Sequence, residues 1–185
     1  MMYASQDLIN EHEGILIGLT ILEKMADKVE QSGIIEISDI EESVNFFKLF
    51  ADKCHHGKEE GFMFPAMQKA GLPNEGGPIA QMLLEHDEGR KYITEMSSSI
   101  ENGALEGNKF IQAAKNYISL MREHIEKENR VLFPFGDKII PMDEQQQLLE
   151  QFEEFEEKVM GKGTHEKLHM LLHNFKVKYL KTPND

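Results

Sequence analysis

The sequence predicts an all-α protein: an up-down four-helix bundle over residues 1–140, with further helices over residues 141–185 packed on that bundle. Glycine and proline divide the chain into segments long enough for helices of roughly 20–30 residues. Within these segments apolar residues recur at steps of three and four, as on one face of a helix. The alternation of apolar and polar residues that is typical of strands is absent.

The first two long helices are expected over residues 5–31 and 39–64. Their apolar faces are Leu8, Ile15, Leu19, Leu22, Ala26 and Val29 in the first, and Val44, Phe47, Ala51 and Phe62 in the second. Ser5 and Ser38 are predicted to be N-terminal caps, because a hydroxyl there can accept a hydrogen bond from an unpaired N–H of the first turn. Glu41, three residues after Ser38, completes the pattern of a capping box.

The next two long helices are expected over residues 77–102 and 108–133. Their apolar faces are Ile79, Met82, Ile93, Met96 and Ile100 in the third, and Phe110, Ala114, Tyr117, Met121 and Val131 in the fourth. Two shorter helices are expected over residues 143–159 and 164–180. Because the connections between segments are short, neighbouring helices should be antiparallel.

The composition excludes several classes of partner. Asp and Glu number 33 against 20 Lys and Arg, so the net charge is −13. This argues against binding to nucleic acid or to an anionic membrane surface. The chain has no apolar run long enough to span a membrane, and its first residues lack the pattern of a signal peptide. With Cys54 as the one cysteine, we expect a cytoplasmic protein in which this thiol is buried and inert; a redox or metal-binding thiolate is the alternative.

Histidines interrupt the apolar face of each long helix. His12, His55, His86 and His124 all stand where the pattern calls for a core residue. Two of them are followed four residues later by a glutamate, and these are Glu59 and Glu128. Residues four apart lie on nearly the same side of a helix, so each glutamate should point inward with its histidine.

A group of this kind predicts a metal site. A buried histidine alone is more often a hydrogen-bonded core residue, but two unpaired buried carboxylates would cost several kcal/mol each or become protonated. Cations among them remove that cost. Four imidazoles and two carboxylates suit two metal ions, and this mixture of donors favours iron, manganese or zinc over calcium or magnesium.

An internal repeat supports the assignment of a histidine and a glutamate four residues apart to the site, once in each half of the chain. The segment HHGKEEGFMFP at 55–65 aligns with HIEKENRVLFP at 124–134, and every aligned pair is separated by 69 residues. The single histidines repeat as well, in EHEG at 11–14 and EHDEG at 85–89. The chain therefore contains two helix pairs that each supply H…HxxxE, which predicts a bundle with approximate twofold symmetry around the metal pair.

These motifs resemble the hemerythrin-like HHE cation-binding family over residues 5–135. The stretch GKGTHEKLH at 161–169 resembles, more loosely, the tail of longer members. The resemblance implies a non-haem centre of two iron ions joined by an oxo or hydroxo bridge, with other divalent metals as an alternative. It also implies that Glu59 and Glu128 bridge the ions and that His12, His55, His86 and His124 are terminal ligands.

The sequence departs from the oxygen-carrying members at one position. They have a second histidine one turn after the histidine of the third helix, where this chain has Arg90. His56, Glu60 or a water molecule could occupy the vacant ligand position, or it could take dioxygen, nitric oxide or peroxide. Because the repeat aligns His55 with His124, we favour His55 as the ligand and expect His56 to lie outside the ligand set or on the surface.

The function implied by this resemblance is binding of dioxygen or a related small ligand for sensing, storage or redox protection. Alternatives are an enzyme that reduces peroxide or nitric oxide with an electron donor, and an iron reservoir or regulator. Glu11, Glu85 and Glu123 each precede a histidine and are expected to be solvated; an outer contact to another imidazole is the alternative. The oligomeric state stays open.

Three further histidines near the C-terminus, His165, His169 and His173, are spaced to share one helix face. They include the HExxH pattern of zinc proteases, but the third ligand of such an enzyme is missing. We expect either a weak auxiliary metal site or a helix that covers the end of the bundle.

Overall fold

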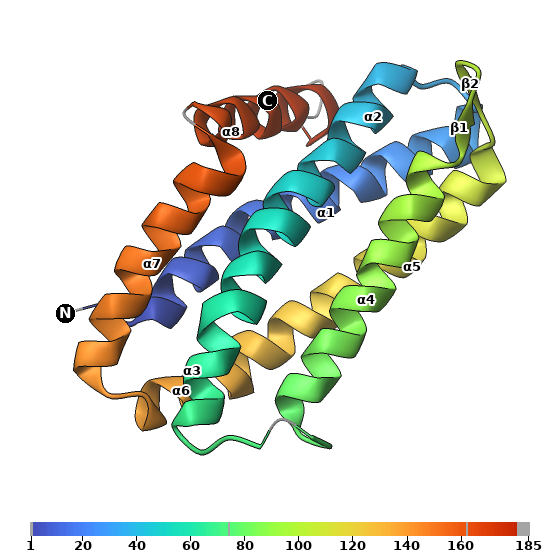
Figure 1. The fold of residues 1–185 in the computed structure, drawn as a ribbon. Helices are drawn as coiled ribbons and strands as arrows, with labels where there is room; N and C mark the ends of the chain where they lie inside the picture. Colours follow the sequence, from blue (N-terminus) through green and yellow to red (C-terminus); the bar gives the residue numbers. More distant parts are fainter. Residues whose placement is uncertain (1, 74, 162, 181–185) are drawn as a thin grey trace.

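The computed structural model describes residues 2–73, 75–161 and 163–180 and confirms the predicted all-α bundle. Four helical rods run side by side (Figure 1). They are α1 (Ala4–Ser32); α2 (Ile37–Phe46) with its continuation η1 (Phe47–His56), η2 (Glu59–Met63) and α3 (Phe64–Lys69); α4 (Pro78–Ser97); and α5 (Gly107–Lys127) with its continuation η3 (Glu128–Leu132) and α6 (Phe133–Ile139). The η segments are π-helical, with wider turns than an α-helix.

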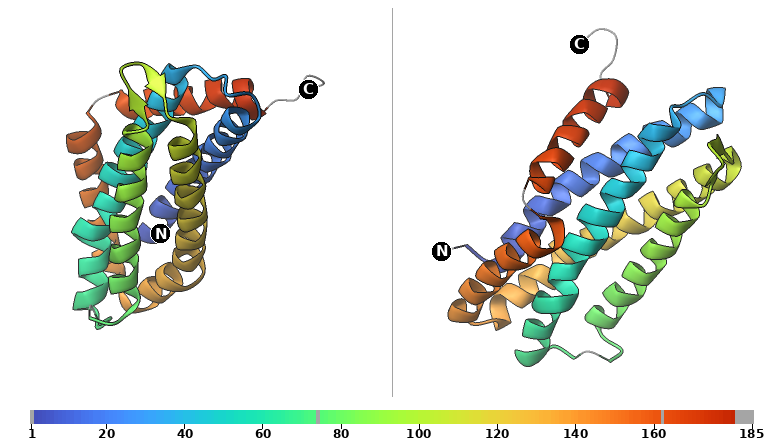
Figure 2. Two further views of the ribbon diagram at one scale, coloured as in Figure 1. Left: turned by 90° about the vertical axis from the view of Figure 1, so that its right-hand side faces the viewer. Right: turned by 45° about the horizontal axis from the view of Figure 1, so that its top comes forward.

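The C-terminal helices pack on the outside of this bundle. They are α7 (Met142–Met160), α8 (Thr164–Phe175) and the π-helical η4 (Lys176–Leu180). In both views of Figure 2, α7 follows the bundle and α8 then changes direction and lies against α1. No helix in the described part of the chain is long and apolar enough to cross a membrane.

The third long helix is shorter than predicted. It ends at Ser97, and Ile100–Glu101, which were predicted to belong to it, form β1, which pairs in an antiparallel hairpin with β2 (Ala104–Leu105). Asn102 and Gly103 form its loop, both with positive φ. This is the geometry that an Asn-Gly pair favours in a two-residue hairpin, and it was the overlooked signal in the sequence.

The predicted caps are also wrong. Helix α1 begins after Tyr3 and α2 after Glu36, and neither has a side-chain cap. The Ser5 hydroxyl instead donates to Asp137, 2.8 Å away on α6, while Ser38 is exposed within α2. A long-range hydrogen bond therefore replaces the local one that the sequence pattern favours.

Two prolines fail to end their helices where the sequence predicted. Pro65 and Pro134 lie within continuous rods, because a π turn precedes each of them. In these turns the N–H of Phe64 donates to the carbonyl of Glu59, and the N–H of Phe133 to that of Glu128, five residues back in each case. The wider turn relieves the clash that a proline ring makes with the carbonyl four residues before it.

A polar layer divides the apolar core into two clusters. On α1, Leu8 belongs to one cluster and Ile15 to the other, with His12 between them. On α4, Met82 and Ile93 belong to different clusters in the same way, on either side of His86. The histidines that interrupt the apolar helix faces in the sequence therefore lie in one layer across the bundle.

Candidate metal centre

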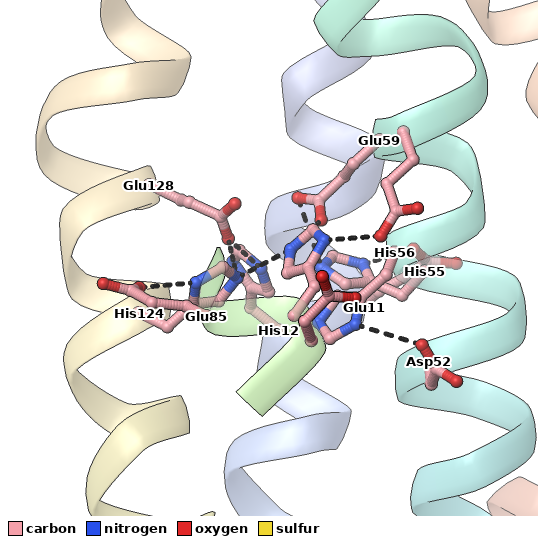
Figure 3. A network of polar contacts seen from close by, with 12 residues as sticks. Glu11, His12, Asp52, His55, His56, Glu59, Glu85, His124 and Glu128 are labelled. Carbon is pink, nitrogen blue, oxygen red and sulfur yellow. Dashed lines mark hydrogen bonds and ion pairs between the residues drawn. The ribbon is translucent and has the colours of Figure 1, made fainter. Parts of the chain in front are cut away.

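The structure brings all six predicted ligand residues together in the polar layer. His12 comes from α1, His55 from η1, Glu59 from η2, His86 from α4, His124 from α5 and Glu128 from η3. None of the six side chains is more than 1% exposed. Figure 3 shows those of His12, His55, Glu59, His124 and Glu128 converging between the rods. Six groups that carry or can carry charge are thus shielded from water.

Two overlapping groups have their donor atoms close enough to share an ion. The first group is His12, His55, Glu59 and Glu128; the second is His56, Glu59, His86 and His124. In each group the candidate donor atoms lie within 4.8 Å of one another. Glu59 belongs to both, so its carboxylate lies between two candidate ion positions.

The Nε2 atoms of the four predicted histidines face the two carboxylates. Glu59 lies between His55, at 3.5 Å, and His86, at 3.3 Å. Glu128 lies between His12 and His124, each at 3.3 Å. Each carboxylate therefore connects a histidine of one helix pair to a histidine of the other, as bridging ligands of two ions would.

The opposite ring nitrogens of these four histidines are held by oxygen atoms further out. The Nδ1 atom lies 2.8 Å from Asn129 in His12, 2.9 Å from Glu11 in His55, 2.8 Å from Glu60 in His86 and 3.0 Å from Glu85 in His124. A carboxylate or amide oxygen accepts the Nδ1–H, which leaves the Nε2 lone pair directed inward. This is the arrangement by which proteins orient metal-binding imidazoles.

Several buried polar atoms in the layer have no hydrogen-bond partner among the described residues. They are all four carboxylate oxygens of Glu59 and Glu128, Nε2 of His12 and of His55, and both ring nitrogens of His56. An unsatisfied buried polar atom costs about 1–3 kcal/mol, and more when it is charged. Cations bound among these atoms would satisfy them together, so the residues present fit a pair of metal ions.

The pKa values of the Glu59 and Glu128 carboxyl groups also indicate that the layer lacks a positive charge. Burial raises the pKa of Glu59 well above its ordinary value, and the nearby charge of Glu128 raises it further. Burial also acts on Glu128, but the charges of His124 and His12 outweigh it and lower the pKa of that carboxyl. Without a cation, one carboxyl of the pair holds a proton while the other is ionised.

His56 is buried in the polar layer, which corrects the expectation that it could lie on the surface. It is 2% exposed, and one of its ring nitrogens lies in the second donor group. The sequence comparison of the two repeats missed it because the aligned residue of the second copy is Ile125. An α-helix turns about 100° per residue, but the wider turn of η1 turns less, so the adjacent His55 and His56 both point inward.

Two of the glutamates expected to be solvated are instead buried. Glu11 and Glu85 are 8% and 5% exposed, and they hold His55 and His124 respectively. Each lies next to one histidine in sequence and contacts another histidine on a neighbouring helix. Although burial opposes it, hydrogen bonds from His124 and Lys127 lower the pKa of Glu85 to about 2, so Glu85 is ionised. Glu123 is exposed, as predicted.

Arg90 lies outside the donor groups and binds carboxylates at the edge of the site. Its guanidinium lies 2.7 Å from Asp52, 2.5 Å from Glu60 and 2.9 Å from Asp87. Glu60 also accepts the hydrogen bond from His86. Arg90 therefore contacts the outer hydrogen-bond partner of His86.

Lys58 occupies the centre of a separate buried cluster. Its ammonium lies 2.8 Å from Glu11, 2.9 Å from Glu156 of α7 and 3.1 Å from Asp7. Cys54, Glu11 and Glu156 are also spaced as a metal site would be, but this ammonium already supplies the positive charge. Burial raises the pKa of the Cys54 thiol to about 12, which agrees with the expectation of an inert thiol.

The C-terminal histidines are separate from this layer. His169 and His173 are exposed on α8, and the side chain of His165 lies outside the described part of the structure. No candidate metal group among the described residues includes His169 or His173. The structure thus gives no support to the expected auxiliary metal site.

Comparison with known proteins agrees with this geometry. The family model described as "Hemerythrin HHE cation binding domain" matches residues 4–135, which include every residue of the two donor groups. No curated protein and no solved structure matches the chain.

Proposed function

Because this chain belongs to the hemerythrin HHE cation-binding domain family, we propose that its buried layer holds two iron ions and binds dioxygen, nitric oxide or peroxide. The role would be sensing, storage or redox protection. The observation that carries the proposal is the orientation of four imidazoles around two carboxylates whose oxygens have no hydrogen-bond partner in the described part of the chain.

Iron suits the donors better than the hard divalent cations do. Imidazole is a good ligand for iron, and the carboxylates balance the charge of a divalent or trivalent ion. Calcium and magnesium prefer sites made of oxygen donors alone. Iron bound here would supply electrons and a coordination position for a small ligand.

The surrounding residues determine what can reach the ions. The aromatic ring of Phe133 stacks on His12 and that of Phe64 on His86, with ring centroids 5.7 and 5.9 Å apart. Together with the two apolar clusters on either side of the layer, these rings exclude bulk water. Small uncharged molecules are therefore the class of ligand that this environment favours.

Metal analysis tests the proposal directly. Protein produced with ample iron should contain about two iron ions per chain and show ferric charge-transfer bands in the near ultraviolet. His124→Ala should lose the bands and most of the iron, whereas His173→Ala, at an exposed histidine of α8, should keep both. Wild-type protein with less than one metal ion per chain would contradict the proposal.

A second candidate function is the catalytic reduction of peroxide or nitric oxide. It is favoured by the contact between His86 and Glu60, because Glu60 is 31% exposed and could pass protons from solvent to the layer. Reduction of hydrogen peroxide to two water molecules consumes two protons and two electrons, the latter from an external reductant. Sustained turnover with a reductant, slowed in Glu60→Gln, would support the enzyme; stoichiometric and reversible binding alone would reject it.

A further inference from the structure

His56 is a deeply buried titratable side chain that does not belong to the proposed set of six ligands. It is 2% exposed, and both of its ring nitrogens lack a hydrogen-bond partner among the residues that the structure describes. A carboxylate oxygen of Asp52 lies 3.6 Å from Nδ1, which is too long for a hydrogen bond. A buried imidazole left in this state loses the free energy of hydration without compensation.

The position of His56 indicates what would satisfy it. A ring nitrogen of His56 lies within 4.8 Å of the donor atoms of the second group, which are those of Glu59, His86 and His124. Its ring also lies against both histidines, with centroids 3.8 Å from that of His86 and 5.6 Å from that of His124.

We propose that His56 is a fifth imidazole ligand, which binds the same ion as His86 and His124. This inference rests on the proposed metal centre. It makes the two ion positions unequal, with three imidazoles at one and two, His12 and His55, at the other. Glu59 contributes to both positions.

The surroundings of Arg90 explain why a residue from η1 would be needed here. Arg90 stands one turn after His86 on α4, where a second ligand from the same helix would lie. Its guanidinium is instead held at the edge of the bundle by Asp52, Glu60 and Asp87. The nitrogen donor therefore comes from the facing rod.

The rings of His56 and His86 are stacked, with an interplanar angle of 11°. Two imidazoles cannot bind one ion in this arrangement, because each ring plane must contain its own bond to the metal. Binding therefore requires the stack to open. A turn of His56 toward Asp52 would let Nδ1–H donate to that carboxylate and leave Nε2 for the ion, as in the other four histidines. The competing role is stacking alone, with no metal bond.

Substitution by phenylalanine separates the two roles. His56→Phe keeps an aromatic ring for the stack but has no nitrogen donor. We would titrate metal-free wild type and variant with Co²⁺ without oxygen, count bound ions per chain, and record the visible Co²⁺ absorption, which reports the donors around the ion. His86→Phe serves as the ligand-loss control and His173→Phe as the control for loss of an exposed histidine.

Wild type and His173→Phe should bind two ions, whereas His56→Phe should bind one tightly. The affinity for the second ion should fall at least as much as it does when a histidine loses its outer hydrogen-bond partner, which is roughly 10–100-fold. The Co²⁺ spectrum should change as it does in His86→Phe. Two ions with wild-type affinity and spectrum in His56→Phe would overturn the inference while leaving the metal centre intact; a wild type that binds none would instead overturn the proposed function. If the circular dichroism of His56→Phe shows loss of helix, His56→Gln replaces it under the same criteria.

Discussion

The ammonium of Lys58 lies 2.9 Å from the carboxylate of Glu156, and this contact joins the C-terminal helix α7 to the polar layer. Lys58 also binds Glu11, whose second oxygen holds His55. Glu156 lies outside the region that the family model matches. Glu156 is thus connected through Lys58 to Glu11, which is the hydrogen-bond partner of the predicted ligand His55.

Removal of the buried charge of Lys58 should destabilise the protein. Lys58→Met leaves Glu11 buried without its cation, and breaking a buried ion pair from one side costs about 3–5 kcal/mol. Urea unfolding followed by circular dichroism would measure the loss. Lys69→Met is the matched control, because Lys69 pairs with Glu144 at the same 2.8 Å but is 74% exposed, and it should change stability little. Equal effects of the two changes would show that burial of Lys58 contributes nothing.

The outer partner of His124 should control metal affinity. Glu85→Ala removes the acceptor of the Nδ1–H, so the ring is free to turn, and affinity should fall about 10–100-fold. Glu123→Ala changes an exposed glutamate next to His124 in sequence and should leave affinity unchanged. The measurement is competition for Zn²⁺ with a chromophoric chelator. The prediction fails if the two variants bind Zn²⁺ alike.

Metal binding should release protons at neutral pH. The raised pKa of Glu59 means that the metal-free protein holds a proton there, and a bridging carboxylate must lose it. Because lower pH favours the protonated form of Glu59, metal affinity should fall as pH falls. Calorimetry in buffers of different ionisation enthalpy should show release of about one proton per chain or more.

A matched variant isolates the contribution of this carboxyl. Glu59→Gln replaces a protonated carboxyl by a neutral amide of similar shape, so the melting temperature of the metal-free protein should change little. The same variant should lose most metal binding, because an amide is a poor bridging ligand. A large loss of stability without metal would mean that Glu59 is ionised in the metal-free protein.

Two glycines one turn apart on α1 should respond oppositely to alanine. A Cβ atom at Gly18 would lie 2.7 Å from a ring carbon of Phe46, so Gly18→Ala should cost about 1–3 kcal/mol through overpacking. At Gly14 the nearest atom, in Phe50, is at an ordinary 3.6 Å, and alanine should stabilise the helix by about 0.5–1 kcal/mol. Melting temperatures of both variants would test whether α1 needs close contact with α2 at Gly18 alone. A stabilised Gly18→Ala would contradict the clash.

The sequence predicted what depends on local periodicity and on the repeat. Inward positions such as His12 and His86 follow from helical spacing, and the equal separation of the two H…HxxxE segments brought Glu59 and Glu128 into one site. What it missed depends on contacts between helices. The capping pattern at Ser5 could not reveal Asp137, and no rule of spacing places Glu11 beside His55, 44 residues away. His56 was missed because its inward direction comes from a π turn, which has no reliable signal in sequence.

Each of the two π turns, η2 and η3, contains one residue more than an α-helical turn would, and this residue determines where the following phenylalanine ring lies. Phe64 follows the first turn and its ring stacks on that of His86; Phe133 follows the second turn and its ring stacks on that of His12. Deleting one residue between Glu59 and Phe64 would restore uniform α-helical bonding and swing the downstream chain by about 100° around the rod. The carboxylate would keep its place while Phe64 turned away, and the imidazole of His86 would lose the ring beneath it. One additional residue in each of these two rods thus lets the rod place both an inward carboxylate and an aromatic ring against a histidine.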